Sequence, residues 1–575
     1  MRRLHTDILI LGAGGAGLFA ALHAHQVDPS LAITVAVKGL LGKCGCTRMV
    51  QGGYNVALGA GDSVERHFMD TIEGGAWLPD QDLAWTLVTG AIERVRELEN
   101  ELGCFFDRNP DGSVHLKAFA GQTFDRTVHK GDLTGIEIMN RLAEAVWVRP
   151  IARLEEHRVH ALLKSGDGAA IAGALLIDLR TGEYVLMHAR AVLLATGGGP
   201  TMYRFHTPSG DKSCDGLALA LAAGLPLRDM EMVQFHPTGL LAGPDTRMTG
   251  TVLEEGLRGA GGQLLDGTGR RFMLDVDARA ERATRDIVSR AIYAEMRAGR
   301  TTPEGGVYLS MAHLGAENVR RQFKGMVERC ADCGFDLAGG KVEVVPTAHY
   351  LMGGVEFAPD CTTGLLGLFV AGEDSGGVHG ANRLGGNGVA NSTVFGGIAG
   401  ATMARWLSGD GAPREPDPAA AAAAIDQAEM PFTARGGGEV DLGLLRERLH
   451  ATMWDDAGIV RNAESLARAE AALAGLHAEH QAYALPSPGR DRGFNLAWHD
   501  WLDLGSLIAV SRAIVRAARA RENSRGAHFR DDYPDPGDLA RSTYTRVRLQ
   551  EGTLACEQVP VRFTRVSPGE TLVPG

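Results

Sequence analysis

One arginine stands inside a run of glycines and small residues, His379-Gly-Ala-Asn-Arg-Leu-Gly-Gly-Asn387. Glycine has no Cβ, so backbone in such a run can approach a ligand closely. The guanidinium of Arg383 is a planar fork that matches a carboxylate. The segment therefore predicts backbone that lies against a cofactor and one cation that faces an anionic substrate. The alternative is a glycine-rich turn with a surface arginine, and the rest of the chain decides between them.

A second glycine motif, Gly12-Ala-Gly-Gly-Ala-Gly17, follows an apolar stretch over 7–11 and precedes a helical pattern over 18–25. A strand, GxGxxG and a helix in this order place a pyrophosphate on the helix N-terminus. A further strand, 32–37, ends in Lys38 and not in the acidic residue that usually holds a ribose hydroxyl. This argues against simple NAD binding and leaves room for a flavin.

Two later apolar stretches indicate strands of the same sheet that return after long insertions. Ala191 to Gly199 ends in Thr-Gly-Gly-Gly, and Gly367 to Glu373 ends in Ala-Gly-Glu. Between 236 and 350 the strand signals weaken, which indicates an inserted α+β module. The proline-rich residues 413–418 mark a linker or domain boundary.

Helical patterns dominate the region from about 440 to 520. Apolar residues recur there at three- and four-residue spacing over Leu442–Met453, Asn462–Gln481 and Leu502–Glu522. The remaining C-terminal segment is mixed, and we expect short strands in it, such as Val559–Val566.

The bulk composition narrows the class of protein. The 575 residues suffice for roughly two to four domains, and the formal net charge of −12 argues against a nucleic-acid partner. We find no secretory signal and no stretch of ~18 apolar residues that would span a membrane. We therefore expect a cytoplasmic protein without direct membrane insertion, peripheral to the inner membrane where partner subunits hold it there.

The eight cysteines lack the spacing of an iron–sulfur site. Cys330-Ala-Asp-Cys333 is a lone CxxC, which fits a helix end better than a metal or redox site. We therefore expect no metal in this chain, and any iron–sulfur centre must come from another subunit.

Taken in order, the motifs resemble the flavoprotein subunits of succinate dehydrogenase and fumarate reductase, a superfamily that also includes L-aspartate oxidase. The resemblance extends from Gly12 to Pro534. It is carried by the arginine segment above and by Gln51-Gly-Gly, Phe119-Ala-Gly-Gln, Asp132-Leu-Thr-Gly, Gln234-Phe-His-Pro-Thr, Thr284-Arg-Asp, Pro346-Thr-Ala-His-Tyr and Ser524-Arg-Gly-Ala-His.

The resemblance implies an α/β fold with a Rossmann-like FAD-binding domain, which would occupy 1–235 and 351–410. It further implies an inserted α+β capping domain over 236–350, which would carry substrate contacts. A helical domain would follow over 430–525, and a small C-terminal domain over 526–575.

By the same resemblance, the substrate lies between the flavin and the capping domain. His236, His349 and Arg383 would hold its carboxylate oxygens, and Phe119 would pack against it and help to twist it. Glu373 would replace the missing second-strand acid as the ribose ligand. The implied FAD-binding residues are Gly12, Gly14, Gly15, Gly17, Lys38, Cys46, Thr47, Gln51, Gly52, Gly53, Thr196, Gly197, Asp215, Glu373, Asn387, Gly388 and Val389.

The chemistry needs a hydride exchange at one carbon and a proton exchange at its neighbour. Arg285 matches the proton-transfer arginine of the family, and Glu255 and Arg258 match the relay that leads to solvent. An arginine is a poor acid because its pKa exceeds ~12, but crowding by other cations and a hydrogen-bonded relay lower that barrier. The alternative is that Arg285 only pairs with Asp286 or Glu281 on a helix.

Two positions depart from the family pattern, and the first concerns the flavin. Respiratory members carry a histidine bonded to the flavin where this chain has Cys46. Loss of that bond should favour reduction of an unsaturated substrate, or oxidation of a more easily oxidised one. We expect dissociable FAD. The alternative is a cysteinyl–flavin bond at Cys46, with Arg48 and Lys43 lowering the pKa of the thiol.

The second departure is Glu254, because the family usually has Thr-Glu-Gly where this chain has Glu254-Glu255-Gly256. That threonine donates a hydrogen bond to a substrate carboxylate, whereas an ionised glutamate would repel it by roughly several kcal/mol when poorly screened. The substrate end there is neutral or cationic, or Glu254 is protonated, or it points away and pairs with an arginine such as Arg247. We favour a substrate other than plain succinate.

The leading interpretation is an FAD-dependent oxidoreductase that acts on the CH–CH bond of a small carboxylic or dicarboxylic acid and exchanges electrons with an iron–sulfur partner subunit. The second is a self-sufficient oxidase of an amino or hydroxy acid, like L-aspartate oxidase. The third is a non-catalytic flavin-binding subunit, against which the joint presence of His236, Arg285, His349 and Arg383 speaks.

Overall fold

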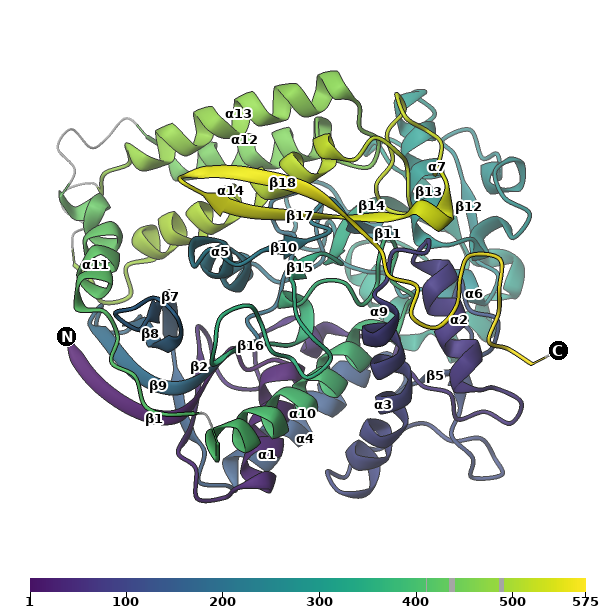
Figure 1. Ribbon diagram of the computed structural model, residues 1–575. Coiled ribbons are helices and arrows are strands. Elements are labelled where there is room, and N and C mark those ends of the chain that lie inside the picture. The colour runs from purple at the N-terminus through teal and green to yellow at the C-terminus, as the bar shows by residue number, and fades with distance from the viewer. Residues whose placement is uncertain (410, 434–439, 486–490, 575) are drawn as a thin grey trace.

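The computed structural model describes residues 1–409, 411–433, 440–485 and 491–574, and the largest sheet in them has seven strands (Figure 1). The spatial order is β6-β2-β1-β9-β8-β7, and β16 also pairs with β9. The pairs among β6, β2, β1, β9 and β16 are parallel, and those of β7 and β8 are antiparallel. The bounds are β1 Arg2–Leu11, β2 Ile33–Val37, β6 Ala152–Glu155, β7 His157–Lys164, β8 Ile171–Asp178, β9 Tyr184–Leu194 and β16 Leu368–Val370.

The predicted order of strand, glycines and helix at the N-terminus is confirmed. Helix α1 (Gly15–Val27) follows β1 directly, and Gly12 between them has a φ of +112°. A Cβ on Gly12 would lie 2.1 Å from the carbonyl oxygen of Ala195, and one on Gly17 would lie 2.0 Å from that of Gly12. Both glycines are therefore required for helix and strand to approach.

The two later strands also join this sheet, as their sequence indicates. β9 lies between β1 and β8, and β16 pairs with β9 in parallel. Helix α10 (Asn387–Leu407) then packs on α1 below the sheet (Figure 1), and Gly400 allows its backbone to meet that of α1. The glycine-rich arginine segment therefore ends where a buried helix begins.

Most of residues 236–350 form a separate module around an antiparallel sheet in the order β11-β14-β13-β12. This module has its own apolar core, which includes Leu240, Ile292 and Leu309. The predicted α+β character is confirmed, and the weak strand signal reflects the short β12 and β13. The bounds are β11 Val233–Leu240, α6 Gly256–Gly259, β12 Gln263–Leu265, α7 Arg285–Arg297, β13 Val307–Ser310, α8 Ala316–Gln322, α9 Lys324–Asp332 and β14 Lys341–Leu351.

The predicted helices of the C-terminal part are confirmed as α12 (Leu442–Asp455), α13 (Ala463–Gln481) and α14 (Leu496–Ala520), and α11 (Pro418–Thr433) precedes them. In Figure 1, α12 and α13 run across the top of the view with α14 just below them, and α11 lies at the left. Helix α14 starts six residues before the predicted Leu502, because the Asn495 side chain accepts a hydrogen bond from the Trp498 amide at 3.0 Å and caps the helix.

The C-terminal segment folds back as a hairpin of β17 (Thr543–Gln550) and β18 (Thr553–Pro560). β17 also pairs with β10 (Leu227–Arg228), whose other neighbour is β15 (Gly354–Val355). The strand predicted over Val559–Val566 is wrong beyond Pro560, which has no backbone N–H to continue a ladder. Val566 instead donates its amide hydrogen to Gln81 Oε1 at 3.1 Å.

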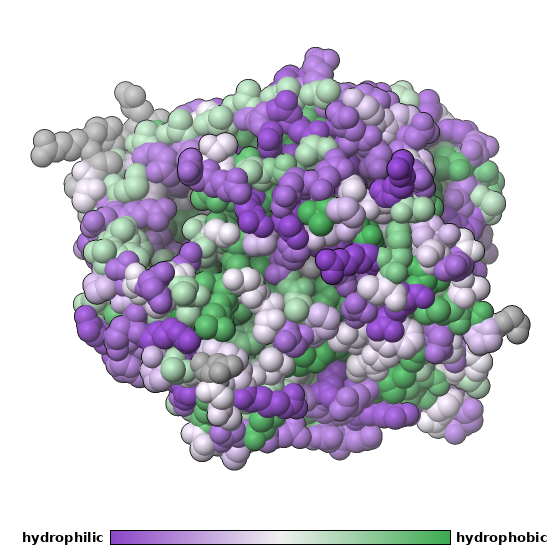
Figure 2. Space-filling model, in the orientation of Figure 1, coloured by the Kyte–Doolittle hydropathy of each residue, from purple (hydrophilic) through white to green (hydrophobic). Residues whose placement is uncertain are grey.

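Of the remaining elements, α4 and α5 each contribute a residue to the lining of the cavity described below. Among the described residues, we find no helix that is both long and apolar enough to cross a membrane. Hydrophilic side chains cover most of the face shown in Figure 2, and hydrophobic atoms gather toward the middle of that view. The remaining bounds are β3 Tyr54–Asn55, α2 Val64–Gly74, α3 Gln81–Asn100, β4 Leu116–Lys117, β5 Thr127–Val128, α4 Thr134–Trp147 and α5 Asp215–Ala222.

Candidate active site and cofactor cavity

One cavity of about 650 Å³ runs from the end of β1 to the capping module, a size usual for cofactor and substrate sites. It joins segments that the chain separates by hundreds of positions. The predicted site residues that line it are Gly12, Gly14, Gly15, Lys38, Cys46, Thr47, Gln51, Gly52, Gly53, Phe119, Thr196, Gly197, Asp215, His236, Glu254, Glu255, Arg285, His349, Glu373, Arg383, Gly388 and Val389.

Three predicted residues lie behind this lining. Gly17 is pressed against the end of β1, and Arg258 is fully buried. Asn387 begins α10, and its side-chain oxygen is hydrogen-bonded to Asn55 at 2.8 Å and to His67 at 2.9 Å. Asn387 therefore fixes the start of α10 through its side chain and does not present that side chain to the cavity.

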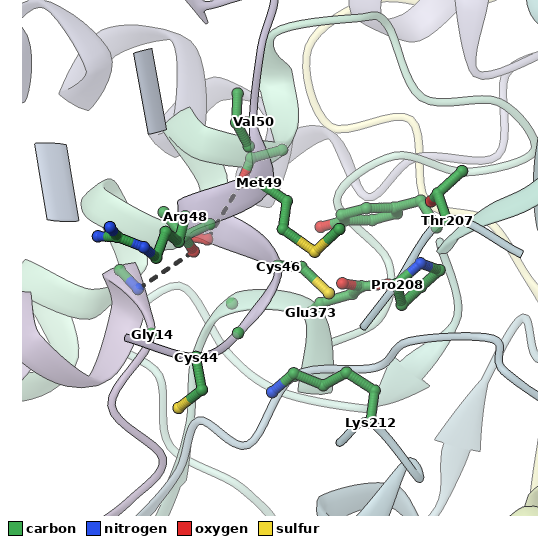
Figure 3. Close-up of a pocket in the computed structure, with 18 of the residues that line it drawn as sticks. Gly14, Cys44, Cys46, Arg48, Met49, Val50, Thr207, Pro208, Lys212 and Glu373 are labelled. Carbon is green, nitrogen blue, oxygen red and sulfur yellow. Dashed lines mark hydrogen bonds between the residues drawn. The ribbon is translucent and has the colours of Figure 1, made fainter. Parts of the chain in front are cut away.

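The N-terminus of α1 opens onto the cavity. The helix begins at Gly15, and its N-cap residue, Gly14, has no side chain that could cap it. The Gly15 amide donates to Thr47 Oγ1 at 3.2 Å, so the loop that carries Cys46 lies across the helix start (Figure 3). Unpaired amides in the first turn of a helix attract an anion such as a pyrophosphate.

Cys46 lies on that loop, near Glu373 and Lys212 (Figure 3). Burial, and then the charge of Glu373, raise the pKa of Cys46 to about 12, although Lys212 opposes them. Arg48 does not activate the thiol, because its guanidinium donates to the Asn140 side chain at 3.0 Å. The cysteinyl alternative needs a lowered thiol pKa, and here that pKa is raised.

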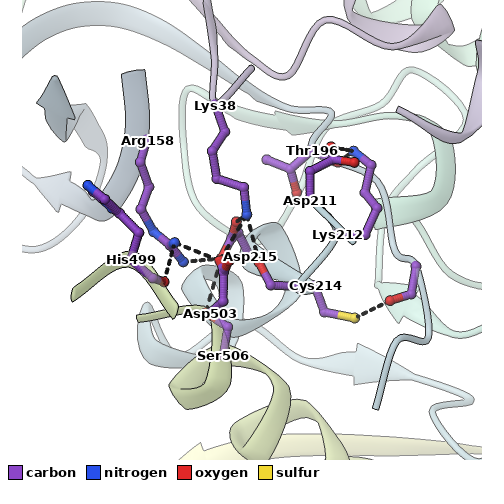
Figure 4. A network of polar contacts seen from close by, with 12 residues as sticks. Lys38, Arg158, Thr196, Asp211, Lys212, Cys214, Asp215, His499, Asp503 and Ser506 are labelled. Carbon is purple, nitrogen blue, oxygen red and sulfur yellow. Dashed lines mark hydrogen bonds and ion pairs between the residues drawn. The ribbon is translucent and has the colours of Figure 1, made fainter. Parts of the chain in front are cut away.

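Four charged side chains meet beside the cavity where β2 ends (Figure 4). Lys38 donates to Asp215 at 3.1 Å and to Asp503 at 2.9 Å. Arg158 donates to Asp215 at 2.8 Å and to Asp503 at 2.6 Å. Of these two carboxylates, Asp215 is the one that lines the cavity, and it meets the end of β2 through Lys38.

Glu373 and its neighbour Asp374 follow β16 and meet the turn after β9. Glu373 accepts hydrogen bonds from the amides of Leu351 at 3.0 Å and Gly199 at 3.3 Å, and burial raises its pKa to about 7. Asp374 accepts from the amide of Thr196 at 2.5 Å. Motif analysis missed Asp374, which shapes the Thr-Gly-Gly turn that lines the cavity.

Arg285, Glu255 and Arg258 form a buried chain of hydrogen bonds. Arg285 Nε and Nη2 donate to Glu255 Oε2 at 3.1 and 2.5 Å, and Arg258 Nη2 donates to Glu255 Oε1 at 3.1 Å. Burial alone would raise the pKa of Glu255, but the two guanidinium groups outweigh it and lower that pKa. Glu255 is therefore an anion between two cations.

The alternative role for Arg285, an ion pair with a helix neighbour, is wrong. Asp286 pairs with Arg290 at 3.2 Å, and Glu281 pairs with Arg271 at 2.6 Å. Arg285 is free to face the cavity with its relay behind it.

The three predicted carboxylate-binding side chains converge on the same part of the cavity. The rings of His236 and His349 have centroids 5.4 Å apart, and burial lowers the pKa of each histidine well below its ordinary value. The Arg383 guanidinium lies over the Tyr350 ring, 4.5 Å from its centroid. Burial and a neighbouring arginine lower the pKa of Arg383 to about 10. Two neutral imidazoles and one cation thus face the substrate position.

Glu254 also lines the cavity and is only 3% exposed. Lys117 Nζ donates to its Oε2 at 3.3 Å, so the proposed partner Arg247 is wrong. Burial raises the pKa of Glu254, and Lys117 offsets this only in part. The Glu254 side chain therefore pairs with a lysine and not with an arginine, and the residue still lines the cavity.

Three polar residues outside the predicted set hold predicted site residues in place. Gln234 accepts from Arg285 Nη1 at 2.9 Å and donates to the Arg383 carbonyl oxygen at 2.7 Å. Thr207 is hydrogen-bonded to His349 Nδ1 at 2.8 Å. Lys117 holds Glu254 as described. Gln234 lies inside a quoted motif, whereas Thr207 and Lys117 belong to none.

The residues present fit FAD. Two buried polar atoms of the lining, Gln51 Oε1 and Arg383 Nε, have no partner in the described part of the chain, as expected where a bound molecule completes the hydrogen bonds. A Cβ on Gly52 would lie 2.3 Å from the Phe119 ring, so bare backbone is needed there. The uncapped start of α1 suits the diphosphate, and Asp215 suits the ribose.

Comparisons with known protein families agree with this geometry. Residues 7–389 match the family described as FAD binding domain. Residues 446–572 match the family described as fumarate reductase flavoprotein C-term. The two matches together span most of the chain, including every predicted site residue.

Individual relatives and solved structures extend along the whole chain. A relative from Methanothermobacter marburgensis, named as part of fumarate reductase (CoM/CoB), is 39% identical over 92% of this chain and 94% of its own. The fumarate reductase flavoprotein subunit of Escherichia coli is 34% identical over 100% of this chain and 97% of its own. A solved structure of the E. coli quinol fumarate reductase covers 99% of both chains, at 33% identity and a TM-score of 0.92. The chain therefore belongs to the succinate dehydrogenase and fumarate reductase flavoprotein family and is an FAD-dependent oxidoreductase.

Proposed function

We propose that the protein moves hydrogen across the CH–CH bond of a small carboxylic acid, in the manner of fumarate reductase and succinate dehydrogenase, and exchanges the electrons with an iron–sulfur subunit. When bound, FAD supplies the hydride chemistry: its reduced form gives a hydride to one carbon of a C=C bond, and its oxidised form takes one from a saturated acid. The full-length relatives named as fumarate reductase subunits support this reaction class.

The observation that carries the proposal is the chain Arg285–Glu255–Arg258, which begins at the cavity and continues behind its lining. The carbon next to the hydride site must gain or lose a proton. Arg285 holds that proton on a guanidinium 2.5 Å from Glu255, which returns a proton after each turnover. Two further buried arginines, Arg258 and Arg383, lie close enough to feel the charge of Arg285.

The acid itself is held by neighbouring groups on both sides of this relay. Arg383 presents a fixed fork to one carboxylate, and the neutral rings of His236 and His349 donate or accept hydrogen bonds without adding charge. Phe119 closes one wall against Gly52. Positioning of this kind supplies much of the rate enhancement in a two-carbon reaction.

We further propose that FAD binds without a covalent bond, because the pKa of Cys46 is raised to about 12 and little thiolate forms at neutral pH. Cys46→Ala is expected to retain bound FAD and at least half of the activity. After acid precipitation, all flavin should appear in the supernatant for both wild type and variant. Flavin fluorescence that stays with the wild-type precipitate, and is lost in Cys46→Ala, would show a cysteinyl bond.

The proposed iron–sulfur partner follows from what the chain does not carry itself. Its eight cysteines lack cluster spacing. Cys330 and Cys333 lie at the end of α9, where Cys330 is buried in the capping core. The electrons of each two-electron step therefore need an acceptor or donor on another molecule.

Glu254 favours a second candidate, an oxidase of an amino or hydroxy acid like L-aspartate oxidase. A buried carboxylate that lines the cavity would suit a substrate ammonium better than a second carboxylate. Such an enzyme would reduce oxygen without a partner subunit.

The deciding experiment uses the purified chain with its flavin reduced. Reoxidation is followed with unsaturated acids and 2-oxo acids, and the oxidised protein is mixed with saturated acids and amino acids in turn. The proposal expects reoxidation by an unsaturated acid and no substrate-dependent oxygen uptake. Rapid oxygen uptake with an amino acid would establish the second candidate, and a flavin that no acid oxidises or reduces would exclude both.

A further inference from the structure

We infer that Asp503, on helix α14 of the C-terminal helical region, is a positioning residue for the adenosine end of FAD and couples cofactor binding to the docking of that helix. Asp503 is absent from the cavity lining, whereas Lys38, Arg158 and Asp215 are part of it. The inference rests on the proposed non-covalent binding of FAD and not on which acid is the substrate.

Asp503 acts through the two cations that it holds. Its Oδ1 accepts from Lys38 Nζ at 2.9 Å and from Arg158 Nη1 at 2.6 Å. The same two cations reach Asp215, Lys38 at its Oδ2 and Arg158 at its Oδ1. Asp503 therefore fixes the positions of both cations around the carboxylate that meets the end of β2 (Figure 4).

Helix α14 presents a built face to this group. His499, Asp503 and Ser506 are spaced so that they share one side of the helix. The His499 carbonyl oxygen accepts from Arg158 at 3.2 Å, and Ser506 Oγ donates to Asp215 Oδ1 at 3.1 Å. Three residues of one helix thus make four hydrogen bonds to cavity residues, which is more than an isolated ion pair between two surfaces.

Charge balance explains why the second carboxylate matters. Lys38 and Arg158 carry two positive charges, and Asp215 alone neutralises only one of them. Arg158 is only 2% exposed, so solvent does little to screen its positive charge. The attraction to both cations outweighs burial and lowers the pKa of Asp503 and of Asp215. Without Asp503, both cations would compete for Asp215 and draw its oxygens away from the ribose.

Coupling between two sites is reciprocal. If docked α14 tightens FAD binding by some factor, bound FAD should stabilise the docking of α14 by the same factor. We expect Asp503→Asn to accelerate FAD release from the holoprotein by roughly 5- to 150-fold, the usual range of such coupling. Hydrogen exchange over 496–520 should slow when FAD binds to the wild type, and this protection should be lost in the variant.

Asp500→Asn is the matched control. Asp500 lies one turn earlier on α14, and its side chain is 60% exposed and pairs with Arg446, which does not line the cavity. Asp500 feels the charges of Lys38 and Arg158 from a distance, so this variant removes a nearby negative charge without removing a direct contact. This control should release FAD like the wild type. At saturating FAD, Asp503→Asn should recover its kcat, because the residue does not touch the reacting groups.

Two results would overturn the inference. One is FAD release from Asp503→Asn within twofold of both the wild type and Asp500→Asn. The other is exchange over α14 that is the same with and without FAD in the wild type. Asp503→Glu guards against a merely unfolded variant, because it keeps the charge and should restore slow release. Neither readout needs a substrate, so the inference and the proposed reaction fail separately.

Discussion

Replacing Arg285 with glutamine is expected to lower kcat by about 10²- to 10⁴-fold, the usual contribution of a positioned acid or base, while FAD stays bound. Glutamine keeps a hydrogen-bond donor toward Glu255 but has no proton to give at neutral pH. The loss should therefore appear in the chemical step and not in cofactor content. Steady-state turnover and the flavin absorbance of the purified variant measure the two separately.

Arg297→Gln on the same helix is the control for this experiment, because its side chain is 62% exposed. It should retain full activity. If Arg285→Gln turned over within fivefold of the wild type, another group would have to deliver the proton, and the relay through Glu255 would lose its role.

Changing Glu254 to threonine is expected to tighten the binding of a dicarboxylate such as succinate or fumarate. Removing a buried negative charge a few ångströms from the second carboxylate relieves about 1–3 kcal/mol at an effective dielectric of about 20, after the offset by Lys117. That corresponds to a Kd lower by roughly 5- to 150-fold. Succinate should reduce the wild-type flavin poorly and the variant flavin readily, as rapid-mixing absorbance would show.

The pH dependence of the same interaction has a fixed sign. Burial raises the pKa of Glu254 above its ordinary value of 4.5. Above the raised pKa the side chain is an anion and repels a dicarboxylate; below it the side chain is neutral and donates a hydrogen bond. Wild-type affinity should therefore rise as the pH falls through that pKa.

Glu254→Gln isolates the charge, because it is neutral at every pH and nearly the same size. Its dicarboxylate affinity should not change with pH over the range where the wild type does. The contradicting outcome is no gain in dicarboxylate affinity in either variant, together with a pH profile of Glu254→Gln that is the same as that of the wild type. It would mean that Glu254 does not face the distal end of the substrate.

Local patterns predicted most of the fold. The turn from β1 to α1 could be predicted because it depends on neighbours in sequence: Gly12 needs a positive φ and Gly17 a close approach to the strand. The helices α12 and α13 followed from apolar periodicity in the same way. The C-terminal hairpin was less visible, because β17 gains its partner β10 only through contacts far along the chain.

In the candidate site, too, local motifs were predictable from the sequence, and contacts between distant residues were not. Residues that lie in long motifs, such as His236, Arg285 and Arg383, line one cavity, and their chemical roles stay predictions. Lys117 and Asp503 were missed, because their roles arise from ion pairs across the fold: Asp503 lies 465 residues from Lys38. Single-sequence patterns encode which face of an element is buried, but not which distant charge will meet it.

Because β10 pairs with β17, it lacks this partner until synthesis has nearly reached the C-terminus. Asp229, which follows β10, meets the Thr545 amide 316 residues later in the chain, and Glu231 binds Arg521 and Thr545 from the same late segment. A ribosome must therefore have made nearly the whole chain before this edge and its buried carboxylates are covered. Until then the strand edge is open and Glu231 lacks Arg521 and Thr545, a state prone to wrong pairing. Closure of this edge is thus a late event in the life of the nascent chain.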